Sequence, residues 1–143
     1  MSFTISVEST TANPPSFYSK GSFNFSQATL PLLLAARESS PNPPSLIFTG
    51  ATASVKGSAK FAAFATMKFA LRAMAQSLAR EFGPQGVHVA HAIIDGVIDI
   101  PRTKDWDLGE GGKIDPNAVS ALHAYVDVSA WEVQTLGNCT NIL

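Results

Sequence analysis

A long amphipathic segment lies between two short apolar runs in this chain of 143 residues. From about residue 59 to 82 large apolar side chains recur at three- and four-residue steps, and Gly83-Pro84 then supplies residues that commonly stop a helix. The runs at 45–50 and 86–96 are apolar on both faces, as strands of a parallel sheet covered by helices are. The order strand, helix, strand predicts a βαβ unit, and therefore an α/β fold with parallel strands.

The segments around this unit carry weaker signals. Residues 1–20 are rich in Ser, Thr, Asn and Pro without periodicity, which predicts an irregular N-terminal segment. A broad apolar stripe after Gly21 predicts a helix that is kinked at Pro31. A polar loop follows residue 96, and a short helix is expected from Asp115 or Pro116 to about 125. We therefore expect one partial α/β domain over 21–125 and an unassigned tail over 126–143.

Composition excludes several classes of function. The formal charge of −1 leaves no basic excess for a nucleic-acid partner. The N-terminus lacks the pattern of a secretory signal, and the longest apolar run is far short of the roughly 20 residues of a membrane helix. A single cysteine, Cys139, cannot form an internal disulfide. We expect a cytoplasmic protein with no membrane contact.

Three consecutive stretches of the sequence carry a resemblance to a known family. They are LIFTGATASVKG, FAAFATMK and ALRAMAQSLAREFGPQGVHVAHAIIDGVID, which lie between Leu46 and Asp99, within a stretch that extends to about Lys104. In this order they resemble the second half of a short-chain dehydrogenase/reductase domain, and their wording is most similar to a fungal branch of that family. The resemblance implies a partial Rossmann-like fold of about two parallel strands with flanking helices, in which the first half of the doubly wound sheet is missing.

The resemblance also assigns catalytic positions, and most of them hold other residues here. Family members place a tyrosine and a lysine one helical turn apart, and the matching residues are Phe64 and Lys68. The position of the family's serine holds Ala51, and that of its asparagine holds Tyr18. A phenylalanine ring can neither donate nor accept a proton, so Lys68 is the retained member of the four.

The chain differs more from the family in the part of the pattern that binds the cofactor. These enzymes hold NAD(P) through a glycine-rich turn after their first strand. The glycines of TGATASVKG do not have that spacing, and about twenty unpatterned residues precede the first expected helix. Cofactor contacts would remain, by resemblance, at Lys68, Asp95, Gly96 and Ile98. We expect no cofactor, with NAD(P) as the cofactor if family binding is retained.

Each of these residues also has an ordinary structural explanation. Lys68 fits a surface row with Arg72, and Phe64 and Met67 fit simple core packing. Asp95 belongs to a set of loop carboxylates, and carboxylates in exposed loops are common in the absence of any ligand. His88 and His91 lie three apart on a strand and therefore on opposite faces, so no metal site is expected.

Together these observations predict a truncated short-chain dehydrogenase/reductase-like protein, a pseudoenzyme without NAD(P)-dependent redox activity. Two alternatives stay open. The chain is an oxidoreductase of the family or a derived non-redox enzyme, an isomerase or cyclase, acting on a small carbonyl or polyketide-like ligand. Alternatively, it is an interaction module that pairs with a full-length family member. Because a small sheet leaves helix faces uncovered, we expect a homodimer or larger homo-oligomer through helices at about 22–37 and 60–82.

Overall fold

The computed structural model describes residues 16–109, 111–124 and 132–135. The helices are α1 (Ser16–Ala36), α2 (Ala62–Phe82) and α3 (Pro116–Ala124), with single 3₁₀ turns at Thr52–Ser54 and Gly83–Gln85. The strands are β1 (Ser45–Thr49), β2 (His88–Ile94), β3 (Val97–Ile98), β4 (Lys113–Ile114) and β5 (Glu132–Thr135). The predicted strand, long helix and second strand are confirmed as β1, α2 and β2, and the predicted short helix is α3.

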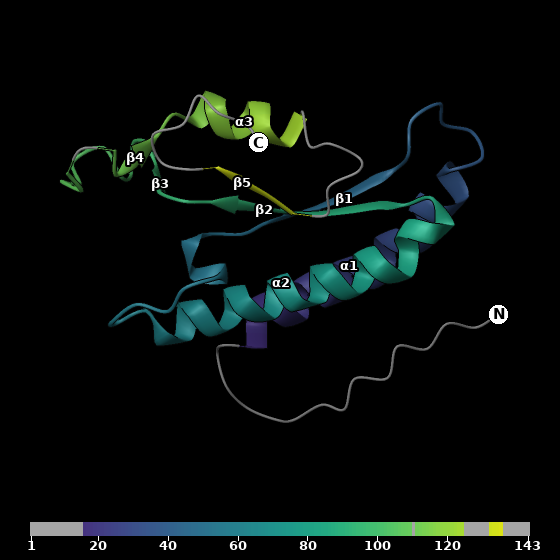
Figure 1. Cartoon of the computed structure of the whole chain (residues 1–143), viewed down its shortest axis with the longest axis horizontal. Helices are drawn as coiled ribbons and strands as arrows, with labels where there is room; N and C mark the ends of the chain where they lie inside the picture. The colour runs from purple at the N-terminus through teal and green to yellow at the C-terminus, as the bar shows by residue number, and fades with distance from the viewer. Residues whose placement is uncertain (1–15, 110, 125–131, 136–143) are drawn as a thin grey trace.

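The main sheet is three-stranded, in the order β1-β2-β5, and all its pairings are parallel. Ser45 of β1 lies opposite His88 of β2, and Ile94 at the far end of β2 lies opposite Thr135 of β5. Helices α1 and α2 cover one face of this sheet, and α3 lies on the other face (Figure 1). The α/β class with a partial Rossmann-like arrangement is thereby confirmed.

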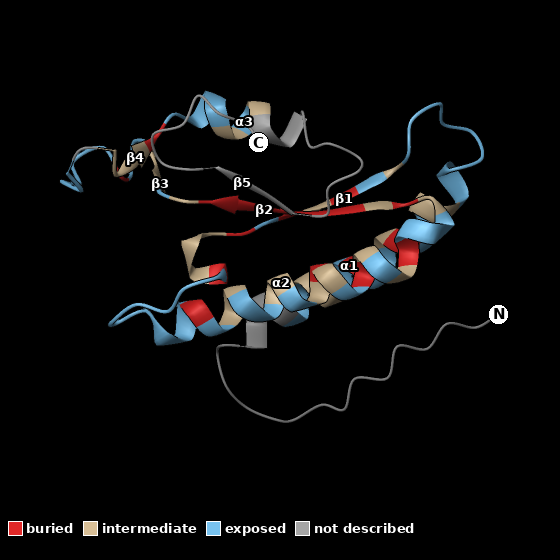
Figure 2. Cartoon of the chain, in the orientation of Figure 1, coloured by how far each residue is buried: buried red, intermediate tan, exposed pale blue. Residues whose placement is uncertain are grey.

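Two apolar clusters hold the layers together. The larger cluster joins the sheet to α1 and α2, and its fully buried members are Leu30, Leu46, Phe48, Ala75, Leu78, Phe82, Val87 and Val89. The smaller one lies on the α3 side and consists of Ala92, Ile94 and Ile114, with Ile47, Ile98 and Val119 packed against it. Strand β2 supplies residues to both clusters because successive side chains point to opposite faces, and six of its seven residues are buried (Figure 2).

Two boundaries, the starts of α1 and α2, differ from the sequence prediction. Helix α1 begins at Ser16, so the last residues of the segment predicted to be irregular are helical. The helix continues through Pro31. Helix α2 begins at Ala62, later than the predicted position near 59.

The strand count is also larger than predicted. The tail contributes β5, which pairs with β2, and the predicted loop contains the short parallel pair β3-β4. Each of these strands has two to four residues, so it forms through pairing with a distant partner rather than through a local pattern. Among the described helices, none combines the length and apolar character needed to span a membrane.

Candidate functional site

The candidate site lies where β1 and β2 end side by side. The Gly50 amide donates to the Ala92 carbonyl at 2.6 Å, which continues the strand pairing beyond β1. The Thr52 hydroxyl then donates to the Asp95 carboxylate, joining the loop after β1 to the loop after β2. Ligands of open α/β sheets bind beside the carboxyl ends of their strands, and this is that edge of the sheet.

A buried serine and histidine support the loop after β1. Ser54 and His91 are both fully buried, and Ser54 Oγ lies 3.4 Å from His91 Nε2. The same Oγ accepts a hydrogen bond from the Ala51 amide at 3.1 Å. Gly50 leaves room for the imidazole ring, because a Cβ at this position would lie 2.4 Å from His91 Cε1. The loop conformation thus depends on a side chain from the middle strand.

Lys68 and Phe64 lie one turn apart on α2 and face each other. The Lys68 ammonium donates to the Thr49 carbonyl at 2.8 Å, and Nζ lies 5.7 Å from the centre of the Phe64 ring. Phe61 packs edge-on against Phe64 with ring centres 6.4 Å apart. The lysine therefore reaches from the helix to the last residue of β1, while the phenylalanine stays 40% exposed beside it.

Burial sets the protonation behaviour of Lys68. Removal of the side chain from water lowers the pKa of its ammonium group below the ordinary value. A carbonyl acceptor and a distant ring are weak partners for a positive charge, and no carboxylate within the described ranges forms an ion pair with Lys68. The neutral form of the Lys68 amine is thus more populated at a given pH than that of an ordinary surface lysine.

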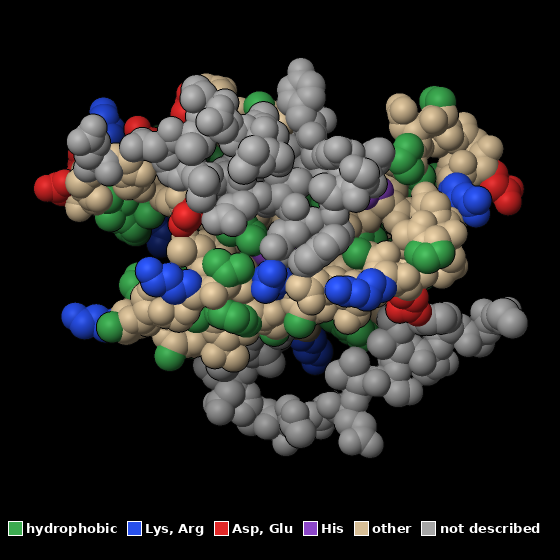
Figure 3. Space-filling model, in the orientation of Figure 1, with side chains coloured by type: hydrophobic (Ala, Val, Ile, Leu, Met, Phe, Trp, Pro, Cys, Tyr) green, Lys and Arg blue, Asp and Glu red, His purple; other side chains and the backbone are tan. Residues whose placement is uncertain are grey.

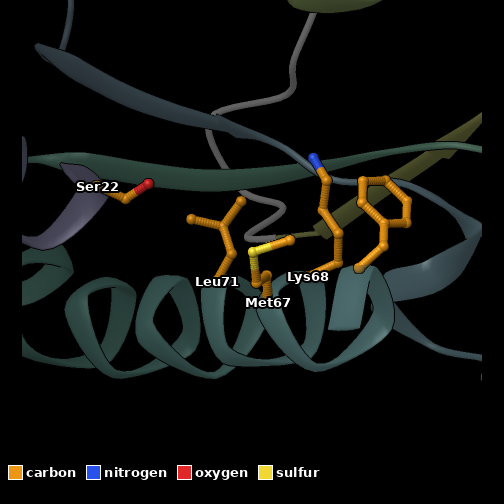
Figure 4. Close-up of a pocket in the computed structure, with 5 residues that line it drawn as sticks. Ser22, Met67, Lys68 and Leu71 are labelled. Atoms are coloured by element: carbon orange, nitrogen blue, oxygen red, sulfur yellow. The ribbon is translucent and has the colours of Figure 1, made fainter. Parts of the chain in front are cut away.

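A cavity of about 330 Å³ opens beside this lysine, between α1 and α2. Its lining is mostly apolar and consists of Ser22, Phe64, Met67, Lys68 and Leu71. Figure 4 shows Met67, Lys68 and Leu71 on the same side of α2, with the amine directed toward the sheet and Ser22 coming from the neighbouring helix. The volume is at the lower end of the range of about 300–1,000 Å³ for small-molecule sites.

The structure brings together some of the predicted site residues. Phe64 and Lys68 line one cavity, and Ala51 begins the turn that Ser54 supports. Asp95 joins this region through Thr52. Tyr18 lies in α1, and its side chain is outside the described residues.

Gly96 and Ile98 lie apart from this cluster. A Cβ on Gly96 would meet Ile114 at 2.8 Å, and Ile98 packs against the smaller apolar cluster on the α3 side. Both residues thus have packing explanations, and their contact with a cofactor stays a prediction. Neither residue lines the cavity beside Lys68.

Thr52, Ser54 and His91 were not among the predicted site residues. The sequence does carry one signal for them, because a histidine inside an otherwise apolar strand must find a polar partner when buried. Which hydroxyl serves as that partner depends on the path of the loop, which the sequence alone does not define. Throughout the part of the chain that the structure describes, no group of three His, Cys, Asp or Glu side chains is placed to hold a metal ion.

Comparison with known proteins identifies the family. A family model described as enoyl-(acyl carrier protein) reductase matches residues 16–128, which is most of the chain. The chain belongs to the short-chain dehydrogenase/reductase family. An uncharacterized oxidoreductase of Staphylococcus epidermidis is 33% identical over 106 residues, which cover 74% of this chain and 44% of the relative. The chain thus spans less than half the length of the curated relatives it matches.

Solved structures agree with this assignment. A short-chain dehydrogenase from Rhodopseudomonas palustris is 36% identical with a TM-score of 0.54, over 81% of this chain and 46% of that one. A short-chain dehydrogenase from Salmonella enterica serovar Typhi reaches a TM-score of 0.69 at 24% identity, over 87% of this chain and 51% of that one. The protein is therefore similar to oxidoreductases in both sequence and fold.

Proposed function

We propose that this short-chain dehydrogenase/reductase-like protein does not perform the tyrosine-dependent NAD(P) redox reaction of its family. The proposal is carried by the pair formed by Phe64 and Lys68. The resemblance places Phe64 at the position of the catalytic tyrosine, and the ring faces the amine of the retained lysine at 5.7 Å. A phenyl ring holds no exchangeable proton, and loss of a general acid typically costs roughly 10²–10⁴-fold in rate.

Neighbouring hydroxyl groups do not replace the missing donors. Ala51, at the position of the family's serine, has only a methyl group. The Thr52 hydroxyl is engaged by Asp95, and Ser54 is fully buried between Ala51 and His91. Reaching a substrate would require either hydroxyl to give up a partner inside the fold, which costs about 1–3 kcal/mol for a buried polar group. The site therefore favours binding over acid catalysis.

Cofactor binding is expected to be weak for a related reason. Of the family's cofactor contacts, Lys68 is retained, and after its bond to Thr49 its amine still has N–H groups that would meet ribose hydroxyls. The glycine-rich turn that receives the pyrophosphate has no counterpart in these 143 residues. When bound, NAD(P) supplies hydride. The contacts expected by resemblance at Lys68 and at residues 95–98 do not replace a pyrophosphate-binding turn, so we propose no functional NAD(P) site on this chain.

A fluorescence titration with NADPH, followed by an assay of NADPH consumption with a panel of small aldehydes and ketones, tests this proposal. We expect no saturable binding up to about 1 mM, the upper end of ordinary KM values, and no consumption above background. Lys68→Met is the matched variant, since it removes the amine of the retained catalytic lysine. Saturable binding with turnover that Lys68→Met abolishes would contradict the proposal.

A second candidate function is association through the helical layer. Several large apolar side chains of α1 and α2 stay exposed, among them Phe25 at 57%, Leu32 at 68% and Phe69 at 43%. Figure 3 shows hydrophobic and basic side chains interspersed over the layer in which the helices lie. Exposed apolar groups of this size favour burial against a partner at about 25 cal/mol per Å². We propose a second copy of this chain as that partner.

A further inference from the structure

The Lys68 amine and the cavity beside it form an unusual combination. The side chain leaves α2, crosses an apolar space and ends at the Thr49 carbonyl, 2.8 Å away. Met67 and Leu71 on one side and Phe64 on the other provide an apolar lining. An amine held at the wall of an apolar cavity is the arrangement in which lysine acts as a nucleophile toward carbonyl compounds.

The chemistry of the amine supports this role. Burial lowers the pKa of Lys68, so its neutral form is populated at lower pH than that of an ordinary surface lysine. The bond to Thr49 uses an N–H as donor, which leaves the lone pair of the neutral amine available. The neighbouring Phe64 ring carries no hydroxyl that would hydrogen-bond this lone pair.

We propose that Lys68 forms a reversible imine with small apolar aldehydes or ketones that enter the cavity between α1 and α2. The amine lone pair attacks the carbonyl carbon, a nitrogen–carbon bond forms, and the amine proton passes through solvent to the oxygen. The resulting carbinolamine loses water to give the C=N bond, so nothing is oxidised or reduced. Imine formation rests on the proposed function, because it requires that Lys68 is not bound to a cofactor.

Trapping with hexanal and sodium cyanoborohydride tests the inference on the intact chain. Cyanoborohydride reduces the imine to a stable secondary amine, and peptide mapping by mass spectrometry then locates the modified lysines. Lys56 and Lys60 in the exposed loop before α2 serve as internal references in the same sample. We expect modification of Lys68 to exceed that of the references on the order of tenfold and to saturate with hexanal, because cavity binding raises the local concentration.

Two variants and a second probe separate the site from general reactivity. Lys68→Arg keeps a cation but removes the nucleophile, and Lys56→Arg is its matched control; circular dichroism confirms that both fold. Glyoxylate, a charged aldehyde, should show no preference for Lys68, because the cavity is mostly apolar. Trapping at Lys68 should persist to lower pH than is usual for a lysine, because burial lowers the pKa of its ammonium group.

Equal modification of all lysines by hexanal, or protection of Lys68 relative to the references, would overturn the inference. This outcome is distinguishable from failure of the proposed function, which is read from NADPH binding and consumption in the absence of trapping reagents. An unmodified Lys68 together with no NADPH binding would reject the imine alone. Tight NADPH binding with turnover would reject the proposed function whatever the trapping shows.

Discussion

At the level of single residues, the polar side chains of the candidate site form hydrogen bonds within the fold. Lys68 bonds to Thr49, and Thr52 bonds to Asp95. The resemblance assigned Lys68, Phe64 and Ala51 to the family's catalytic positions, because the matching motifs lie within one helix and one loop. The contact between Ser54 and His91 joins residues that are far apart in sequence, so it could not be predicted from the residues alone.

Gly50 lies directly against the His91 ring. A Cβ at this position would lie 2.4 Å from Cε1 and 2.5 Å from Nε2 of His91, whose ring is fully buried, so the ring or the loop would have to shift. We therefore expect Gly50→Ala to destabilise the fold by about 1–3 kcal/mol, as overpacked core sites do.

Urea denaturation followed by circular dichroism measures this change. Gly57→Ala is the matched control, since a Cβ there has no heavy atom within 4 Å. The free energy of unfolding of Gly57→Ala should be close to that of the unmodified protein. Equal free energies of unfolding for the two variants would show that the contact between Gly50 and His91 does not constrain the loop.

At the scale of elements, prediction from sequence succeeded where the pattern was long and local. The apolar period of α2 and the continuous apolar runs of β1 and β2 identified these elements near their observed bounds. Strand β5 was missed because four residues with one large apolar side chain carry no pattern. Its pairing with β2, rather than its own sequence, makes it a strand.

The buried face of α2 gives the second prediction. Leu78 is 5% exposed and belongs to the cluster that joins the helical layer to the sheet. Leu78→Ala should lower the free energy of unfolding by about 2–5 kcal/mol, because truncation leaves a cavity that its neighbours fill only in part.

Leu108→Ala is the matched control for this prediction, since it makes the same truncation at a side chain that is 41% exposed. Surface substitutions of this kind usually stay within about 0.5 kcal/mol. Thermal unfolding of both variants measures the difference. If Leu108→Ala lowered the free energy of unfolding as much as Leu78→Ala, the result would be inconsistent with the described core.

At the scale of the whole molecule, a three-stranded sheet and its helices must bury enough apolar surface to be stable. Helices α1 and α2 pack on one face of the sheet, yet their outer surfaces keep exposed apolar side chains such as Phe25 and Leu32. Association through this surface would add the burial that the small sheet lacks. The sequence predicted both helices, and association through them stays a proposal.

Light scattering coupled to gel filtration tests this proposal. We expect the unmodified chain to elute as a dimer or larger oligomer, and Leu32→Glu to shift it toward the monomer, because a carboxylate in an apolar interface is costly. Leu108→Glu, a matched change in an exposed loop position, should leave the mass unchanged. A folded monomer at all protein concentrations would exclude self-association through these helices.

We propose that the chain, which holds Lys68 but has Phe64 at the position of the family's tyrosine, does not transfer hydride. The direct measurement uses NADPH that carries deuterium on the transferred position, with mass spectrometry of the carbonyl compounds after incubation with the purified chain. We predict no deuterium in any alcohol product, for the unmodified chain and for Lys68→Met alike. Incorporation of deuterium by the unmodified chain, lost in Lys68→Met, would contradict this proposal.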